Sequence, residues 1–151
     1  MEEQRREASR AEKLKSIEEL MARYCFAHDE RRLDLLEGCL AVGIVRHGAE
    51  GRDAVMRQYA EVYEAQSDVR RRHVLTNFLF LEEGEREARV QAYETFYLIK
   101  GEEVTLHLTG IYRVHAVLEE GRWLVQGLES AFDVPYDPGD YPRVEASRFS
   151  D

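Results

Sequence analysis

The change of periodicity near residue 70 constrains the fold more than any other feature of the sequence. Beyond that point three glycine-containing turn signals, EEGERE, IKGEE and LEEGRW, separate long runs in which apolar and polar residues alternate. Such alternation is typical of half-buried strands, and short glycine turns join antiparallel neighbours. We therefore expect a four-stranded antiparallel meander with strands at residues 70–82, 88–100, 104–118 and 122–132.

The first half of the chain has helical periodicity instead. Apolar residues at i, i+3, i+4 and i+7 spacing, from Leu14 to Tyr24, predict a long first helix that starts near Ala8. A short second helix that ends at Gly38 is predicted in RRLDLLEGCL. A longer third helix is predicted in GRDAVMRQYAEVYEAQ, where Asp53 lies near its start. Between them, the β-branched segment LAVGIVRHG predicts a short strand at an edge of the meander.

This order of elements indicates an α+β fold, in which the helices pack on one face of an antiparallel sheet. A chain of 151 residues suits one domain. We expect a charged lead-in at residues 1–13, the domain at residues 14–134 and an irregular tail at residues 135–151. The tail is expected because all three prolines lie beyond Phe132.

Charge and composition disfavour several classes of function. The net charge of −9 argues against a nucleic-acid partner, and the one basic cluster, VRRRH, is short. No apolar run is long enough to cross a membrane and the charged N-terminus has no signal-peptide core, so we expect a cytoplasmic protein. The two cysteines, Cys25 and Cys39, predict free thiols. No glycine-rich phosphate loop is present, and we predict no cofactor.

Two ionisable residues stand at the end of the first predicted helix, in the segment YCFAHDERRLD. On a helical wheel His28 lies near the centre of the apolar face, and Asp29 lies at its margin. A structural interpretation is that His28 favours the negative end of the helix and Asp29 belongs to the following turn. A functional interpretation requires partners from the strands.

Two strands offer such partners. In RRRHVLTNFLF, His73 and Asn77 share one face, and either face of this strand could be directed at the helices. In ARVQAYETFYLI, Glu94 shares the more apolar face with Phe96. A carboxylate among apolar side chains is either paired or has a raised pKa. The alternative is a surface ion pair, or a face that is misassigned by one residue.

The histidines of the next strand have a less certain orientation. His107 and His115 share its more polar face and are expected at the solvent or at a subunit contact, unless a bulge near Gly110 turns His107 inward. Two histidines and a carboxylate could also hold a metal ion. Because no pair of them has the close spacing of a metal site, we predict no metal.

Five segments in this order resemble the SnoaL-like branch of the NTF2-like superfamily, from about residue 17 to residue 132: IEELMARYCFAHDERRLDLLEGCL, GRDAVMRQY, RRHVLTNFLF, LTGIYRV and EEGRWLVQGLES. The resemblance implies a cone, in which three N-terminal helices pack on a curved, mainly antiparallel sheet that encloses a pocket. Members include scytalone dehydratase, bile-acid dehydratase, hexachlorocyclohexane dehydrochlorinase, polyketide cyclases and small subunits of ring-hydroxylating dioxygenases.

The resemblance also implies catalytic roles. In the dehydratase and dehydrochlorinase relatives, an aspartate at the end of the first helix orients a strand histidine that removes a proton. Those positions fall on Asp29 and His73 in this sequence. In the dehydratases a tyrosine five residues before that aspartate helps to polarise the substrate, and this position falls on Tyr24. His28 is then only the neighbour of the orienting acid.

Substrate-binding residues follow from the resemblance with two departures. An additional acid of the bile-acid dehydratases falls on Phe96, with Glu94 one step away on the same face, and only His107 could act as the second histidine of scytalone dehydratase. The predicted substrate-binding residues are Glu94, Phe96, His107, Asn77 and Trp123.

We therefore predict a cofactor-free lyase or isomerase, of dehydratase or cyclase type. It would act on a small hydrophobic molecule in an enclosed, apolar pocket by Asp29–His73 general base catalysis. The alternative is a non-catalytic module for ligand binding or subunit assembly on the same cone. An outward sheet face with Tyr93, Tyr97 and Ile111 predicts a homodimer or homotrimer.

Overall fold

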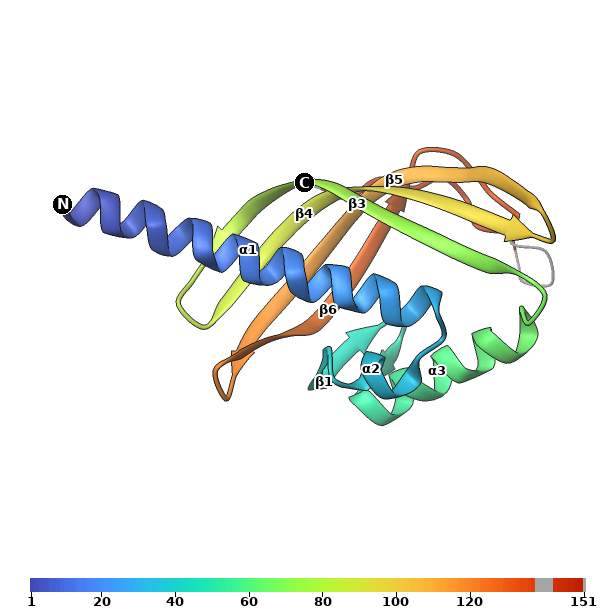
Figure 1. The fold of residues 1–151 in the computed structure, drawn as a ribbon, viewed down its shortest axis with the longest axis horizontal. Coiled ribbons are helices and arrows are strands. Elements are labelled where there is room, and N and C mark those ends of the chain that lie inside the picture. Colours follow the sequence, from blue (N-terminus) through green and yellow to red (C-terminus); the bar gives the residue numbers. More distant parts are fainter. Residues whose placement is uncertain (138–142, 151) are drawn as a thin grey trace.

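The computed structural model describes residues 1–137 and 143–150 and has the expected α+β architecture (Figure 1). In chain order the elements are α1 (Glu2–Asp29), α2 (Leu33–Glu37), β1 (Leu40–Arg46), β2 (Ala49–Glu50), α3 (Arg52–Ala65), β3 (Arg70–Glu83), β4 (Glu87–Lys100), β5 (Glu103–Glu119) and β6 (Arg122–Phe132). The strands form one sheet in the order β2-β1-β6-β5-β4-β3.

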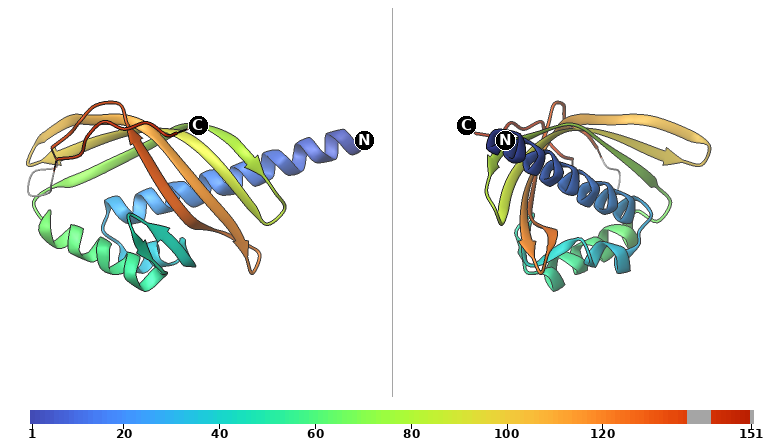
Figure 2. Two further views of the ribbon diagram at one scale, coloured as in Figure 1. Left: turned by 180° about the vertical axis from the view of Figure 1, so that it is seen from behind. Right: turned by 60° about the vertical axis from the view of Figure 1, so that its left-hand side comes forward.

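The four long strands form the predicted antiparallel meander. The early strand β1 adds to this meander as a parallel neighbour of β6, and the short strand β2 pairs with β1. The sheet is curved and stays open, because β2 and β3 are its two edges (Figures 1 and 2). Its curvature leaves one concave face, which the helices cover.

Helix α1 is longer than the sequence predicts. It begins at Glu2 rather than near Ala8, and its first turns project beyond the sheet (Figures 1 and 2). The charged first segment is rich in Glu, Arg, Ala and Lys, which are strong helix formers, so the chain is helical even where its described side chains are exposed. Lys13 Nζ donates to the backbone carbonyl of Gly84, 2.9 Å away, at the β3–β4 turn. Within the part of the chain that the structure describes, no helix combines the length and apolar character that a bilayer span requires.

The core lies between the concave face and the apolar side of α1. The largest fully buried side chains of α1 are Ile17, Leu20, Met21 and Tyr24, and they belong to one cluster with Val90, Val114 and Val125 of the sheet. Burial of this stripe explains the helical period of the first half of the sequence. Cys25 and Cys39 are free and buried, as predicted.

The end of α1 is fastened to the end of α3 by Arg31. Its backbone has a left-handed φ of 55°, which turns the chain at the helix end. The guanidinium donates to the carbonyl oxygens of Tyr63 and Ser67, at 3.3 Å each, and to those of Gln66 and Val69. These charge-assisted hydrogen bonds fix the last turn of α1 beside the start of β3.

A bulge in β3 decides which of its side chains face the helices. Asn77 has a φ of 58°, and the pairing with β4 shifts between Thr76 and Leu79. His73 is directed inward before the bulge, Phe78 packs on the core after it, and the side chain of Asn77 is exposed. Asn77 therefore does not share the inward face of His73, contrary to the prediction, because the extra residue reverses the alternation.

A second bulge lies in β5. Phe96 of β4 pairs with Leu108, but the next residue of β4 pairs with Leu106, which leaves His107 as the extra residue. The bulge therefore lies at His107 itself rather than near Gly110, and His107 reaches the concave side together with Leu108. The expectation that His107 faces solvent is wrong for this reason.

The described residues of the C-terminal tail pack back on the sheet. Tyr136 and Val144 form an isolated antiparallel bridge, and the backbone N–H of Ser147 donates to the carbonyl of Phe132 at 3.0 Å. Pro138 and Pro142 lie outside the described residues. The tail thereby adds Tyr136 to the open end of the concave face.

Candidate active site

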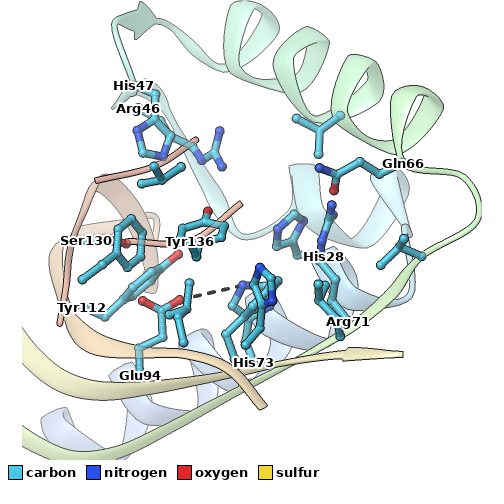
Figure 3. Close-up of a pocket in the computed structure, with 18 of the residues that line it drawn as sticks. His28, Arg46, His47, Gln66, Arg71, His73, Glu94, Tyr112, Ser130 and Tyr136 are labelled. Carbon is cyan, nitrogen blue, oxygen red and sulfur yellow. Dashed lines mark ion pairs between the residues drawn. The ribbon is translucent and has the colours of Figure 1, made fainter. Parts of the chain in front are cut away.

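A cavity of about 560 Å³ lies between the concave face of the sheet, the C-terminal end of α1 and α3 (Figure 3). Side chains of β3, β4 and β5 form one wall, and β1, α3 and the tail supply the others. The cavity has the size of a site for a small organic molecule. Its bottom contains ionisable groups from three separate elements, His28 of α1, His73 of β3 and Glu94 of β4.

Asp29 holds His73 through two contacts. The Oδ1 atom of Asp29 is 2.6 Å from Nδ1 of the His73 ring, and Oδ2 accepts a 2.8 Å hydrogen bond from the backbone N–H of His73. Both side chains are buried, at 5% and 10% exposure. A carboxylate oxygen accepts hydrogen bonds, so Nδ1 donates its proton and Nε2 presents a lone pair to the cavity. The structure thus brings together the two residues that the family resemblance paired.

Glu94 lies beside the free nitrogen of His73. Its Oε1 is 3.9 Å from Nε2, and its Oε2 has no hydrogen-bond partner among the described residues. The side chain is buried, as its place on the apolar face of β4 predicted. Burial raises the pKa of Glu94, and the neighbouring His73 opposes this effect. Burial thus shifts the Glu94 carboxyl group, next to the His73 ring, toward its protonated form.

The replacement Glu94→Gln is expected to stabilise the protein increasingly as the pH rises. Because burial raises the pKa of Glu94 in the folded state, its contribution to stability is complete below the ordinary glutamate pKa. It is lost as the pH rises through the raised pKa, whereas glutamine stays neutral. We expect the Tm of the variant to exceed that of the wild type by about 2–6 °C near neutral pH.

Thermal unfolding over a series of pH values measures this difference. Glu82→Gln is the matched control, because Glu82 is an exposed residue that pairs with Arg89 on the surface. The control should show no rising difference. A Tm difference for Glu94→Gln that does not depend on pH would contradict a buried, neutral carboxyl group.

His28 belongs to the wall of the cavity, although the family resemblance implied that it is only the neighbour of Asp29. It is buried, its Nδ1 lies 2.8 Å from the hydroxyl of Tyr63, and its ring centroid is 5.1 Å from that of His73. Burial lowers the pKa of His28, and His73 and Arg46 lower it further. A neutral imidazole beside the base adds no positive charge to the place where a proton must be accepted.

Tyr24 does not reach the cavity, contrary to the prediction. It is 1% exposed, and its hydroxyl group forms a hydrogen bond with the hydroxyl of Tyr59. Tyr112 of β5 lines the cavity instead and lies beside Glu94, and Tyr136 of the tail also lines it (Figure 3). Burial raises the pKa of Tyr112, so its hydroxyl stays a hydrogen-bond donor. Tyr24 and Asp29 are five residues apart on the helix, so their side chains leave it in different directions. Tyr24 points into the core.

The other predicted substrate-binding residues divide into two groups. Phe96 and His107 line the cavity, and the ring of Phe96 lies 4.6 Å from His73 and 5.8 Å from His107 between their centroids. Burial lowers the pKa of His107, whose Nε2 has no partner among the described residues. Asn77 and Trp123 are not among the residues that line the cavity: the first is exposed at its bulge, and the second packs on the core near the β5–β6 turn.

The cavity is less apolar than the sequence predicts. Arg46 and Arg71 line it together with apolar residues such as Leu98 and Leu108. Arg71 could have been found from the strand alternation, because it lies two residues before His73 and thus on the same face. Arg46 had no such signal. Within the described part of the chain, no three His, Cys, Asp or Glu side chains converge as metal ligands would.

Comparison with known proteins assigns the chain to a family. A family model for the SnoaL-like domain matches residues 9–129, most of the chain. The chain belongs to the SnoaL-like family. The resemblance seen in the sequence is therefore confirmed. No curated protein matches this SnoaL-like protein.

Solved structures share the fold of this SnoaL-like protein at low sequence identity. A protein of Catenulispora acidiphila in complex with S-DNPA is 22% identical, with 82% of this chain and 95% of that chain covered and a TM-score of 0.73. A proposed scytalone dehydratase of Novosphingobium aromaticivorans is 20% identical, with 93% and 94% covered and a TM-score of 0.73. The beta subunit of a proposed aromatic-ring-hydroxylating dioxygenase of the same organism is 12% identical, with 83% and 92% covered and a TM-score of 0.71.

Proposed function

We propose that this protein is a cofactor-free lyase or isomerase, of dehydratase or cyclase type, in which His73 is the general base. The observation that carries the proposal is the double contact of Asp29 with His73, at 2.6 Å to the ring and 2.8 Å to the backbone. A base held in one tautomer at the wall of a cavity is typical of enzymes that abstract protons. We expect it to act in the cytoplasm, as the sequence predicts.

The reaction that these groups suit best is the loss of water from a β-hydroxy ketone. His73 Nε2 takes a proton from the carbon beside the carbonyl group, and the electrons of that C–H bond form a C=C bond. The C–O bond at the neighbouring carbon breaks, and Glu94 in its protonated form donates its proton to the departing oxygen, which leaves as water. Tyr112 is placed to donate to the carbonyl oxygen, in the role that the resemblance gave to Tyr24.

The two charges left after the reaction stabilise each other. An imidazolium on His73 and a carboxylate on Glu94 lie next to each other, with 3.9 Å between Nε2 and Oε1. The positive charge lowers the pKa of Glu94 at the moment when this group must release its proton. A water molecule that relays the proton from His73 back to Glu94 restores the starting state. Isomerisation needs only the first step and return of the proton to another carbon.

The relatives support this chemistry at the level of the family. One of the similar structures is described as a proposed scytalone dehydratase, and another contains a bound small molecule, S-DNPA. All are less than a quarter identical to this chain, so the substrate has to be found by experiment.

The proposal is tested with tetralone and a β-hydroxytetralone in heavy water. Tetralone reports abstraction of a carbon-bound proton as deuterium uptake, and the hydroxytetralone reports loss of water as formation of naphthol. We expect both reactions with the wild type, and a loss of about 10²–10⁴-fold for His73→Ala. Equal rates for the two proteins, or none above the rate in buffer, would contradict the proposal.

A second role, subunit assembly, is favoured by the outer surface of the sheet. Tyr93, Val104 and Leu106 are each more than half exposed, at 55%, 63% and 57%. Tyr97 and Ile111 of the predicted patch are partly buried. Exposed apolar side chains on strands suit an interface, and one similar structure is a dioxygenase beta subunit. The molecular mass in solution tests the predicted homodimer or homotrimer.

A further inference from the structure

The cavity holds two permanent positive charges in a strongly acidic protein. Arg46 and Arg71 line it, while the chain as a whole has a net charge of −9. Several surface arginines are paired with carboxylates: Arg72 Nη1 lies 2.8 Å from Glu30, and Arg32 Nη2 lies 2.8 Å from Asp34. Among the described residues, neither cavity arginine forms such an ion pair.

The environment of Arg46 accounts for its charge. Its guanidinium lies 4.2 Å from the centroid of the Tyr59 ring and 3.4 Å from Oε1 of Gln58. Burial lowers the pKa of Arg46, but Tyr59, Tyr24 and Tyr112 around it outweigh this effect, so that the pKa is raised. A cation on an aromatic face, with hydroxyl groups around it, is satisfied without a ligand.

Arg71 is compensated only in part. It is 8% exposed, and burial and the neighbouring Arg31 lower its pKa, although Tyr63, Tyr136 and Asp29 oppose this shift. Figure 3 shows it beside Gln66 and His28, on the side of the cavity away from Arg46. A buried guanidinium without a carboxylate is costly, and such a cost is maintained where the group has a task.

We propose that the ligand of this site is an organic anion, whose carboxylate forms a bidentate ion pair with Arg71. The inference rests on the proposed function, because it names the substrate class for the same cavity. Arg71 lies two residues before His73 on one strand face, about 7 Å along the strand. A molecule with its carboxylate at Arg71 therefore extends its reacting carbon toward Nε2 of His73, and its apolar body lies against Phe96, Leu98 and Leu108.

The chemistry of the guanidinium supports a carboxylate in particular. Its planar fork matches the two oxygens of a carboxylate, and a charge-assisted pair in a site of low polarity is stronger than one at the surface. Three of the four histidines that line the cavity offer little competition for the anion. Burial lowers the pKa of His28, His47 and His107, so each favours its neutral form.

Binding of naphthoate and of naphthamide tests the inference, because the two probes differ only in the charged group. Calorimetric titration is carried out on the wild type, on Arg71→Met and on Arg72→Met. We expect the wild type to bind naphthoate at least about 10-fold more tightly than naphthamide. Arg71→Met should weaken naphthoate by about 10- to 100-fold and leave naphthamide unchanged.

Arg72→Met is the matched control, because the neighbouring arginine pairs with Glu30 and does not line the cavity. It should keep the preference for naphthoate. Equal affinities for the two probes in the wild type, no binding of naphthoate, or a preference that survives in Arg71→Met would overturn the inference.

Thermal unfolding without ligand gives a second measurement that does not depend on the probes. Removal of an uncompensated buried charge should leave the Tm of Arg71→Met equal to or above that of the wild type. A drop of several degrees would overturn the inference, because Arg71 would then have a structural role. Arg71→Lys, which keeps the charge without the fork, should bind naphthoate with intermediate affinity.

Failure of the two proposals can be told apart with His73→Ala. This variant should lose proton abstraction but keep the preference for naphthoate. If the wild type prefers naphthoate and exchanges no protons, the catalytic proposal fails and the anion site stands. If it exchanges protons but binds both probes equally, the anion site fails and the catalytic proposal stands.

Discussion

Asp29→Asn is expected to slow proton abstraction by about 10²–10⁴-fold without unfolding the protein. In the wild type both carboxylate oxygens accept hydrogen bonds, one from the ring and one from the backbone of His73. An amide has a single oxygen. Because the backbone N–H of His73 can only donate, it takes that oxygen, and the amide N–H₂ is left facing Nδ1.

The consequence is a change of tautomer. An amide donor at Nδ1 requires a lone pair there, so the proton of the neutral ring moves to Nε2. His73 then presents an N–H to the substrate and can no longer accept a proton. The rate falls because the ring proton of His73 is on Nε2 instead of Nδ1, while the position of the ring is unchanged.

Deuterium uptake by tetralone measures the effect. Asp34→Asn is the matched control, because Asp34 is an exposed residue of α2 that pairs with Arg32 and lies outside the cavity. The control should react at the wild-type rate. Unchanged uptake by Asp29→Asn would show that Asp29 does not set the state of the base.

Gly110→Ala is expected to destabilise the protein by about 3 kcal/mol or more, the upper range for overpacking against rigid atoms. A Cβ atom at this position would lie 2.3 Å from the carbonyl oxygen of Ala131 in β6. That oxygen belongs to the backbone and cannot move aside without displacing the strand. We expect the Tm to fall by roughly 6–12 °C.

The same substitution should disturb the site, because Gly110 is the β4–β5 pairing partner of Glu94. Gly127→Ala in β6 is the control: its Cβ would lie 3.6 Å from Cβ of His115, an ordinary contact. Its stability should stay within about 1 kcal/mol of the wild type. Urea unfolding compares the two variants, and equal stability for both would contradict the close approach of β5 and β6.

Local signals predicted the architecture well. The turn segments around Gly84, Gly101 and Gly121 separate the four strands of the meander, because glycine turns and alternation are properties of neighbouring residues. The helical stripe of α1 was equally clear. The start of α1 was missed because a charged segment without apolar residues has helix propensity but no face that marks it.

Strand alternation predicted part of the site. It placed Glu94 on the inward face, because Glu94 lies in a regular part of its strand, whereas it left both faces of the His73 strand open and the family resemblance pointed to His73. Asn77 was placed wrongly and the inward turn of His107 was not located, because one extra residue at a bulge reverses every later side chain. No local pattern marks such a bulge.

Tyr112 lines the cavity in place of the predicted Tyr24, and this difference depends on packing across the whole core. Tyr24 fills the space beneath the cavity against Tyr59, and only the assembled sheet brings Tyr112 to the surface of the cavity. The charged character of the cavity has the same origin. Arg46 lies at the end of β1 and Arg71 near the start of β3. Only folding brings the two side chains to the same cavity.

The tautomer of His73 tests the central claim most directly. Nitrogen NMR of labelled protein at alkaline pH, where histidine side chains are neutral, distinguishes the protonated from the unprotonated ring nitrogen. The spectrum of His73→Ala assigns the His73 signals among the five histidines. We predict a proton on Nδ1 in the wild type and on Nε2 in Asp29→Asn. A proton on Nε2 in the wild type, or a mixture of tautomers that ignores the substitution, would contradict the account.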